Sequence, residues 1–230
     1  MAALEIDALV FDVLGTLVDE PAGLRVGIRA LDPSLDETRV EELLALWQQH
    51  VEREQRRVVD GARAYVTSET IDREAAQLVA DEVDGDATAL ALSARRLPPW
   101  PDTVAGLARL AERFPLIGLS NASRTALLGL NAHAGLRWHQ ALSAEDARTY
   151  KPDPAVYQLA VTVSGLQPER LLMVATHAWD LRGAQRLGLR TAYVARPVGD
   201  PPVPEDRFDL YADDLADLAD RLDKPWTRRR

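Results

Sequence analysis

Short apolar runs that end on polar residues recur along this chain, and they constrain its fold more than any other feature. They lie at residues 8–11, 116–119, 171–175, 191–195 and 208–210. Continuous apolar runs of this length are typical of strands buried on both faces of a parallel sheet. Helical patterns separate the later runs. This alternation predicts an α/β fold with a doubly wound, Rossmann-like parallel sheet and right-handed crossovers.

Residues 20–97 break this rhythm. They are rich in Glu, Arg, Ala and Leu, with long helical patterns over 37–57 and 69–81 and no strand-like run. We therefore predict a helical cap domain, residues 19–97, inserted into an α/β core domain formed by 1–18 and 98–230. The Pro-rich stretch at 97–101 is expected to form a stiff return connection.

Composition excludes several classes of function. The 230 residues carry a net charge of −9, which offers no basic field for nucleic acid. There are no cysteines, and so neither disulfides nor a thiol nucleophile. No apolar stretch approaches the roughly 20 residues that a membrane span needs. We expect a soluble cytoplasmic protein that binds neither nucleic acid nor membrane.

Asp12 follows the first apolar run directly, so we expect its carboxylate at the carboxyl edge of the sheet. Open α/β sheets bind ligands at that edge. Polar residues also follow the second and third runs, and a lysine precedes the helix that Asp153 and Pro154 are expected to start. We expect one crevice to collect these residues, which are Asp12, Thr16, Ser120, Asn121, Lys151, His177 and Asp180.

Lys151 stands out by its residue type. Of the 27 basic residues only Lys151 and Lys224 are lysines. A chain that otherwise uses arginine retains a lysine where a compact ammonium is needed. Lys224 lies near the C-terminal end of the chain and carries little weight, so Lys151 is the candidate.

Four motifs resemble those of the haloacid dehalogenase superfamily, and within it the type II 2-haloacid dehalogenases. They are FDVLGTLVD at 11–19, LSN at 119–121, YKPD at 150–153 followed by Tyr157, and HAWDLRGA at 177–184. The resemblance covers nearly the whole chain, including a cap after the first motif. The Trp-Asp-x-x-Gly-Ala form of the fourth motif is characteristic of the dehalogenase branch.

The resemblance implies a hydrolase that displaces halide from a small 2-haloacid through a covalent ester on Asp12. Lys151 would keep Asp12 ionised, while Thr16 and Ser120 would donate hydrogen bonds to the carboxylates or the substrate. Asp180, with His177, would position or activate the water that hydrolyses the ester. The residues expected to bind substrate are Val13, Leu14, Gln48, Ser120, Asn121, Tyr157 and Trp179.

Neither a metal nor another cofactor is expected. Phosphoryl transfer calls for a metal ion and usually an acid that protonates the leaving group. The superfamily's phosphatases carry that acid two residues after the nucleophile, where this chain has Leu14. Asp12 and Asp180 alone make a thin magnesium site. Halide leaves without a proton, so displacement at carbon fits this set of residues.

Departures from the dehalogenase pattern keep two alternatives open. Gln48 stands where an arginine usually cradles the halide, Leu14 replaces an aromatic residue, Ala175 replaces a serine and His177 an asparagine. His177 is either a functional group beside Asp180 or a helix cap. The alternatives are a related hydrolase acting on another substrate, including a magnesium-dependent phosphatase, and a catalytically silent binding protein. The family also allows a homodimer, which no feature of this sequence indicates.

Overall fold

The computed structural model describes residues 5–223, and a parallel sheet in the order β3-β2-β1-β4-β5-β6 forms the centre of this part of the chain. The strands are β1 Ala8–Phe11, β2 Leu116–Ser120, β3 Gln140–Ser143, β4 Leu171–Ala175, β5 Arg190–Val194 and β6 Leu210–Ala212. The central strand β1 has Leu9 opposite Leu116 of β2 and Leu172 of β4. The predicted doubly wound α/β class is confirmed, and Asp12 follows the central strand.

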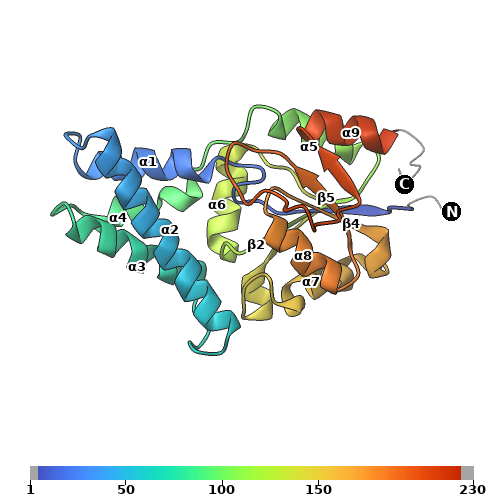
Figure 1. Ribbon diagram of the computed structural model, residues 1–230, viewed down its shortest axis with the longest axis horizontal. Helices are drawn as coiled ribbons and strands as arrows, with labels where there is room; N and C mark the ends of the chain where they lie inside the picture. Colours follow the sequence, from blue (N-terminus) through green and yellow to red (C-terminus); the bar gives the residue numbers. More distant parts are fainter. Residues whose placement is uncertain (1–4, 224–230) are drawn as a thin grey trace.

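Helices cover both faces of the sheet (Figure 1). One face carries α5 Thr103–Ala111, α6 Arg124–Ala134 and α9 Leu215–Asp223; the other carries α7 Pro154–Ser164 and α8 Ala178–Arg186. Strand β1 alternates between them, because Leu9 and Phe11 pack in the first layer while Ala8 and Val10 pack in the second. A strand buried on both sides must be apolar at every position, which explains the first run of the sequence.

Between β1 and β2 the chain forms a helical insertion, drawn at the left of Figure 1. Its helices are α1 Glu20–Leu31, α2 Glu37–Val59, α3 Ser68–Asp81 and α4 Ala87–Ala91, followed by the 3₁₀ turn η1 Ser93–Arg95. Asp19 and Asp36 cap the first two helices by accepting the N–H groups of Ala22 and Arg39. The insertion has its own apolar core, which includes the buried Trp47. The exact domain boundaries stay a prediction.

Two strands differ from the sequence prediction. The apolar pattern missed β3, because this edge strand exposes Gln140 and Ala141 and needs no continuous apolar run. At the other edge, β6 begins at Leu210, where the predicted run ends. Two further 3₁₀ turns, η2 Ala144–Ala147 and η3 Pro168–Arg170, precede α7 and β4. As predicted, Asp153 caps α7 and Pro154 is its first residue.

Within residues 5–223, no helix combines the length and the apolar character that crossing a membrane requires. Lys224 lies outside the described residues.

Candidate active site

Asp12 sits at the centre of a closed hydrogen-bond network. Its backbone N–H donates to Val174 O of β4 at 3.0 Å, which extends the strand pairing by one residue. Its side chain is 8% exposed. The carboxylate Oδ2 accepts the hydroxyl of Thr16 at 2.6 Å, and Oδ1 accepts Lys151 Nζ at 2.9 Å. Both oxygens are therefore oriented by donors.

The turn after Asp12 fixes the direction of the Thr16 proton. Thr16 Oγ1 accepts the backbone N–H of Thr176 at 3.0 Å. Because that bond uses a lone pair, the hydroxyl proton is free to point at Asp12. Gly15 has φ of +76°, which favours glycine, and a Cβ there would lie 2.7 Å from His177 Nε2. The turn thus needs both its glycine and its threonine.

Lys151 lies between two carboxylates. Its Nζ donates to Asp12 Oδ1 at 2.9 Å and to Asp180 Oδ2 at 2.7 Å, and its side chain is 1% exposed. Burial on its own lowers the pKa of Lys151, but the charges of Asp12 and Asp180 outweigh it, so the net shift is upward. The ammonium therefore stays charged, and we name the group Asp12, Lys151 and Asp180 the charge triad.

Asp180 is the fully buried member of the charge triad. Its Oδ1 accepts the hydroxyl of Tyr157 at 2.6 Å, and Oδ2 accepts Lys151 Nζ. Burial raises the pKa of Asp180 above its usual value, while the positive charge of Lys151 opposes the shift. An upward shift brings a carboxylate nearer to the range in which it takes a proton efficiently at neutral pH.

Asn121 contacts the charge triad through the backbone of Lys151. Its Oδ1 accepts the backbone N–H of Lys151 at 2.9 Å, and its Nδ2 donates to Gln55 Oε1 of α2 at 2.8 Å. The adjacent Ser120 is buried, and its hydroxyl accepts the N–H of Ala122 at 3.1 Å. Asn121 therefore orients the lysine, whereas Ser120 closes its own turn.

His177 contacts the nucleophile turn. It is the N-cap residue of α8 but forms no side-chain capping bond there. Its Nε2 lies 3.3 Å from Leu14 O, and its ring centroid lies 5.7 Å from that of Trp179. In the described residues no hydrogen bond joins His177 to the carboxylate of Asp180.

The remaining predicted substrate-binding residues differ in exposure. Val13 is buried in the core, and Leu14 packs half-buried against the same cluster. Trp179 is half-buried, and its backbone N–H donates to Asp200 Oδ2 at 3.1 Å. Gln48 is exposed on α2, next to the buried Trp47. The structure thus brings Asp12, Thr16, Lys151, Asp180 and Tyr157 together and leaves Gln48 on the helix surface.

Sequence reasoning missed the residues that join the cap to the core beside the charge triad. Besides Gln55 with Asn121, Tyr150 donates its hydroxyl to Val66 O at 2.8 Å, and Ser123 donates its N–H to Ser68 Oγ at 2.8 Å. Nothing in the sequence distinguishes Gln55 from the other polar residues of a helix that is rich in Glu and Arg. Tyr150 belongs to the third motif, but its partner lies 84 positions away.

Two half-buried acids of the insertion were missed as well. Burial raises the pKa of Glu20, with Asp12 adding to the shift and His177 opposing it. Burial raises the pKa of Asp72 well above its usual value, and the charge of Glu20 adds to this. In residues 5–223 neither carboxyl has a hydrogen-bond or ion-pair partner. Glu20 therefore lies within electrostatic reach of both Asp12 and Asp72.

The donor set does not fit a magnesium ion. Both carboxylate oxygens of Asp180 already accept hydrogen bonds, one from Lys151 and one from Tyr157. The apolar Leu14 takes the position of a possible acidic ligand. Across the described part of the chain, no three His, Asp or Glu side chains gather as a metal site.

The sheet order, the carboxylate after the central strand and the helical insertion define an α/β protein of the haloacid dehalogenase fold. The chain matches the model of the family described as haloacid dehalogenase-like hydrolase over residues 6–188, and it belongs to that family.

The chain is also similar to individual curated proteins and solved structures. Over 202 residues the chain is 30% identical to the (S)-2-haloacid dehalogenase of Pseudomonas sp. (strain YL), covering 83% of each chain. A 33% identical match to (S)-2-haloacid dehalogenase H-109 of Pseudomonas putida spans 55% of this chain but only 58% of that protein. The structure of L-2-haloacid dehalogenase from Xanthobacter autotrophicus with covalently bound chloropropionic acid superposes with a TM-score of 0.82. That pair is 26% identical, with 94% of this chain and 98% of the other covered.

Proposed function

We propose that this hydrolase is a metal-independent 2-haloacid dehalogenase that works through a covalent ester on Asp12. The observation that carries the proposal is the charge triad, in which one buried ammonium binds a candidate nucleophile and a second carboxylate at 2.9 and 2.7 Å. A nearby cation favours the ionised form of a carboxylate, and only that form is a nucleophile. The covalently bound chloropropionic acid in a structural relative supports the substrate class.

In the first step Asp12 attacks the carbon that bears the halogen. The new bond joins a carboxylate oxygen to that carbon, and the carbon–halogen bond breaks with its electron pair leaving on the halide. No proton is needed, which agrees with an apolar Leu14 two residues after the nucleophile. Thr16 and Lys151 hold the carboxylate in one orientation for the attack.

In the second step water attacks the carbonyl carbon of the Asp12 ester. Asp180 takes a proton from that water and gives it to the alkoxide oxygen as the bond between that oxygen and the Asp12 carbonyl carbon breaks. The 2-hydroxy acid leaves, the second proton of the water passes to solvent, and one oxygen of the restored Asp12 carboxylate comes from solvent. The hydrogen bond from Tyr157 and the upward-shifted pKa suit Asp180 to this role. We assign His177 to holding the nucleophile turn through Leu14 O, in addition to the predicted contact with water.

The substrate is expected to lie between Asp12 and the insertion. Leu14 and Trp179 would form the apolar wall, and the N–H groups of Val13 and Leu14 would bind the substrate carboxylate. Gln48, which is exposed on α2, would supply an amide and not a guanidinium if it contacts the halide. Halide stabilisation without a guanidinium favours good leaving groups such as bromide and chloride over fluoride.

The test is halide release by the purified protein from L-2-chloropropionate, L-2-bromopropionate and chloroacetate, with EDTA present. We expect turnover that EDTA leaves unchanged and that Asp12→Asn abolishes. A single turnover in H₂¹⁸O should place the label in the peptide that contains Asp12. Absence of halide from every acid rules out the proposal, and phosphate release that depends on magnesium would identify the phosphatase alternative instead.

A further inference from the structure

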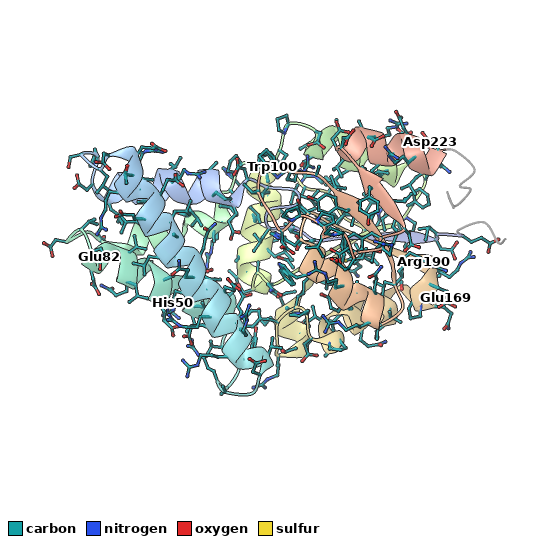
Figure 2. All side chains as sticks on the ribbon, in the orientation of Figure 1. His50, Glu82, Trp100, Glu169, Arg190 and Asp223 are labelled. Carbon is teal, nitrogen blue, oxygen red and sulfur yellow. The ribbon has the colours of Figure 1, made fainter. Side chains whose placement is uncertain are left out.

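In the turn that follows Asp12, three successive backbone carbonyl groups accept hydrogen bonds from side chains. Gly15 O accepts Trp100 Nε1 at 2.9 Å, Thr16 O accepts Arg196 Nε at 2.9 Å, and Leu17 O accepts Thr103 Oγ1 at 2.8 Å. Trp100 and Thr103 belong to the segment that returns from the insertion, and Figure 2 labels Trp100 at this junction. Arg196 follows β5 and is the only charged donor of the three.

Arg196 is itself held rigidly. Its Nη1 donates to Asp102 Oδ1 at 2.8 Å, and Asp102 Oδ2 accepts the N–H of Leu215 at 2.8 Å. The guanidinium carbon lies 5.8 Å from the ring centroid of Trp100. The side chain of Arg196 is 6% exposed, which is close to the 8% of the Asp12 side chain.

This arrangement is costly for a residue that only stabilises the fold. Among the described residues, Arg196 Nη2 is buried without any hydrogen-bond partner. A buried donor without a partner costs free energy, and a buried cation requires compensation that one half-buried carboxylate supplies in part. An apolar side chain would fill the space without these costs. An apolar side chain cannot reproduce the bonds to Asp102 and Thr16 O, and of these two only the bond to Thr16 O reaches the turn that follows Asp12.

That bond leads directly to the nucleophile. The Thr16 carbonyl belongs to the residue whose hydroxyl donates to Asp12 Oδ2 at 2.6 Å and accepts the N–H of Thr176 at 3.0 Å. A shift of the Thr16 backbone would move the hydroxyl away from one partner or both. A hydrogen bond joins each successive pair of residues from Asp102 to Arg196, Thr16 and Asp12.

We propose that Arg196 is a positioning residue that orients the carboxylate of Asp12 by fixing the main chain of Thr16. The inference rests on the proposed function for its kinetic consequences, but the fixed turn itself is independent of which substrate is used. Arg196 touches neither the reacting atoms nor the charge triad. Its effect must therefore pass through Thr16.

The experiment is a double-mutant cycle between Arg196→Met and Thr16→Val, measured by halide release. We expect each single variant to lower kcat about 10- to 100-fold with KM changed less than about threefold, the size typical of a lost orienting contact. The double variant should be no more than about twofold slower than Thr16→Val alone, because both changes remove one orienting path. Arg170→Met is the matched control and should keep wild-type kcat, because it breaks a half-buried pair with Asp7 at the opposite end of β1 from Asp12.

A second readout does not need activity. Hydrogen–deuterium exchange of the peptide covering residues 12–19 should be faster in Arg196→Met than in wild type and in Arg170→Met. Additive losses in the cycle, an unchanged kcat or unchanged exchange would each overturn the inference. If Arg196→Met does not fold, Arg196→Lys enters the same measurements. If wild type releases no halide, the proposed function fails, and the exchange data alone decide the role of Arg196.

Discussion

Removing the ammonium of Lys151 provides a quantitative test of the charge triad. Lys151→Met keeps a long apolar stem but leaves Asp12 and Asp180 facing each other, at 6% and 0% exposure. Breaking a buried ion pair by deleting one partner costs about 3–5 kcal/mol, because the remaining charge is uncompensated. For a chain of this size, where 1 kcal/mol shifts Tm by about 2–4 °C, the expected decrease in Tm is about 6–20 °C.

The decrease should depend on pH. Burial already raises the pKa of Asp180, and in Lys151→Met the opposing charge of Lys151 is gone, so the folded-state pKa of Asp180 should lie still further above that of the unfolded chain. A raised carboxyl pKa gives stability that is complete below the unfolded pKa and is lost as pH rises through the folded pKa. The difference in Tm from wild type should therefore be larger at pH 8 than at pH 5.

Thermal denaturation followed by circular dichroism at both pH values measures this effect. The companion variant Lys151→Met with Asp180→Asn removes one of the uncompensated charges and should recover part of the lost Tm at pH 8. Neither variant should release halide, because Asp12 loses the ammonium that orients its Oδ1. A Tm at pH 8 within about 2 °C of wild type, or an equal loss at pH 5 and pH 8, would refute the reasoning.

Two further variants probe the carboxyl groups around the nucleophile. Tyr157→Phe removes the 2.6 Å bond to Asp180 Oδ1, so the pKa of Asp180 should rise further and the acid limb of the kcat–pH profile should move to higher pH; a profile that overlays wild type contradicts this role. Asp72→Asn removes a carboxyl whose pKa burial raises. Because such a carboxyl destabilises the folded protein as pH rises, the Tm of the variant should exceed that of wild type at pH 8 but not at pH 4. Thermal scans at the two pH values check the second variant, and a gain of equal size at both would count against it.

The sequence predicted the parts of the fold that local pattern determines. Strand β1 must be apolar on both faces, so its run and the carboxylate after it were visible without coordinates. Edge strand β3 was not, because one side of it faces solvent and its residues include the exposed Gln140. A short apolar run indicates a strand that is buried on both faces. It does not indicate an edge strand, which pairs with only one neighbouring strand and can carry exposed residues.

Within the site, residues on strand ends were easier to predict than residues on the cap. The turn after β1 and the two motifs that carry Lys151 and Asp180 all converge at the carboxyl edge, as parallel strands require. Whether a cap residue faces the site depends on how the helix packs. Gln48 neighbours the buried Trp47 yet is exposed, while Gln55 on the same helix reaches Asn121.

The charge triad also connects the two proposed steps. Before attack it carries two carboxylates and one ammonium, with a net charge of −1. Ester formation would neutralise Asp12 and leave Lys151 paired with Asp180 alone, so the net charge of the charge triad would change from −1 to zero as halide departs. The loss of the Asp12 charge removes one cause of the raised pKa of Asp180, while burial, the larger cause, persists. In the proposed second step Lys151 remains paired with Asp180 and opposes that upward shift. In the proposed reaction one lysine between two acids would thus serve the nucleophile first and the base second.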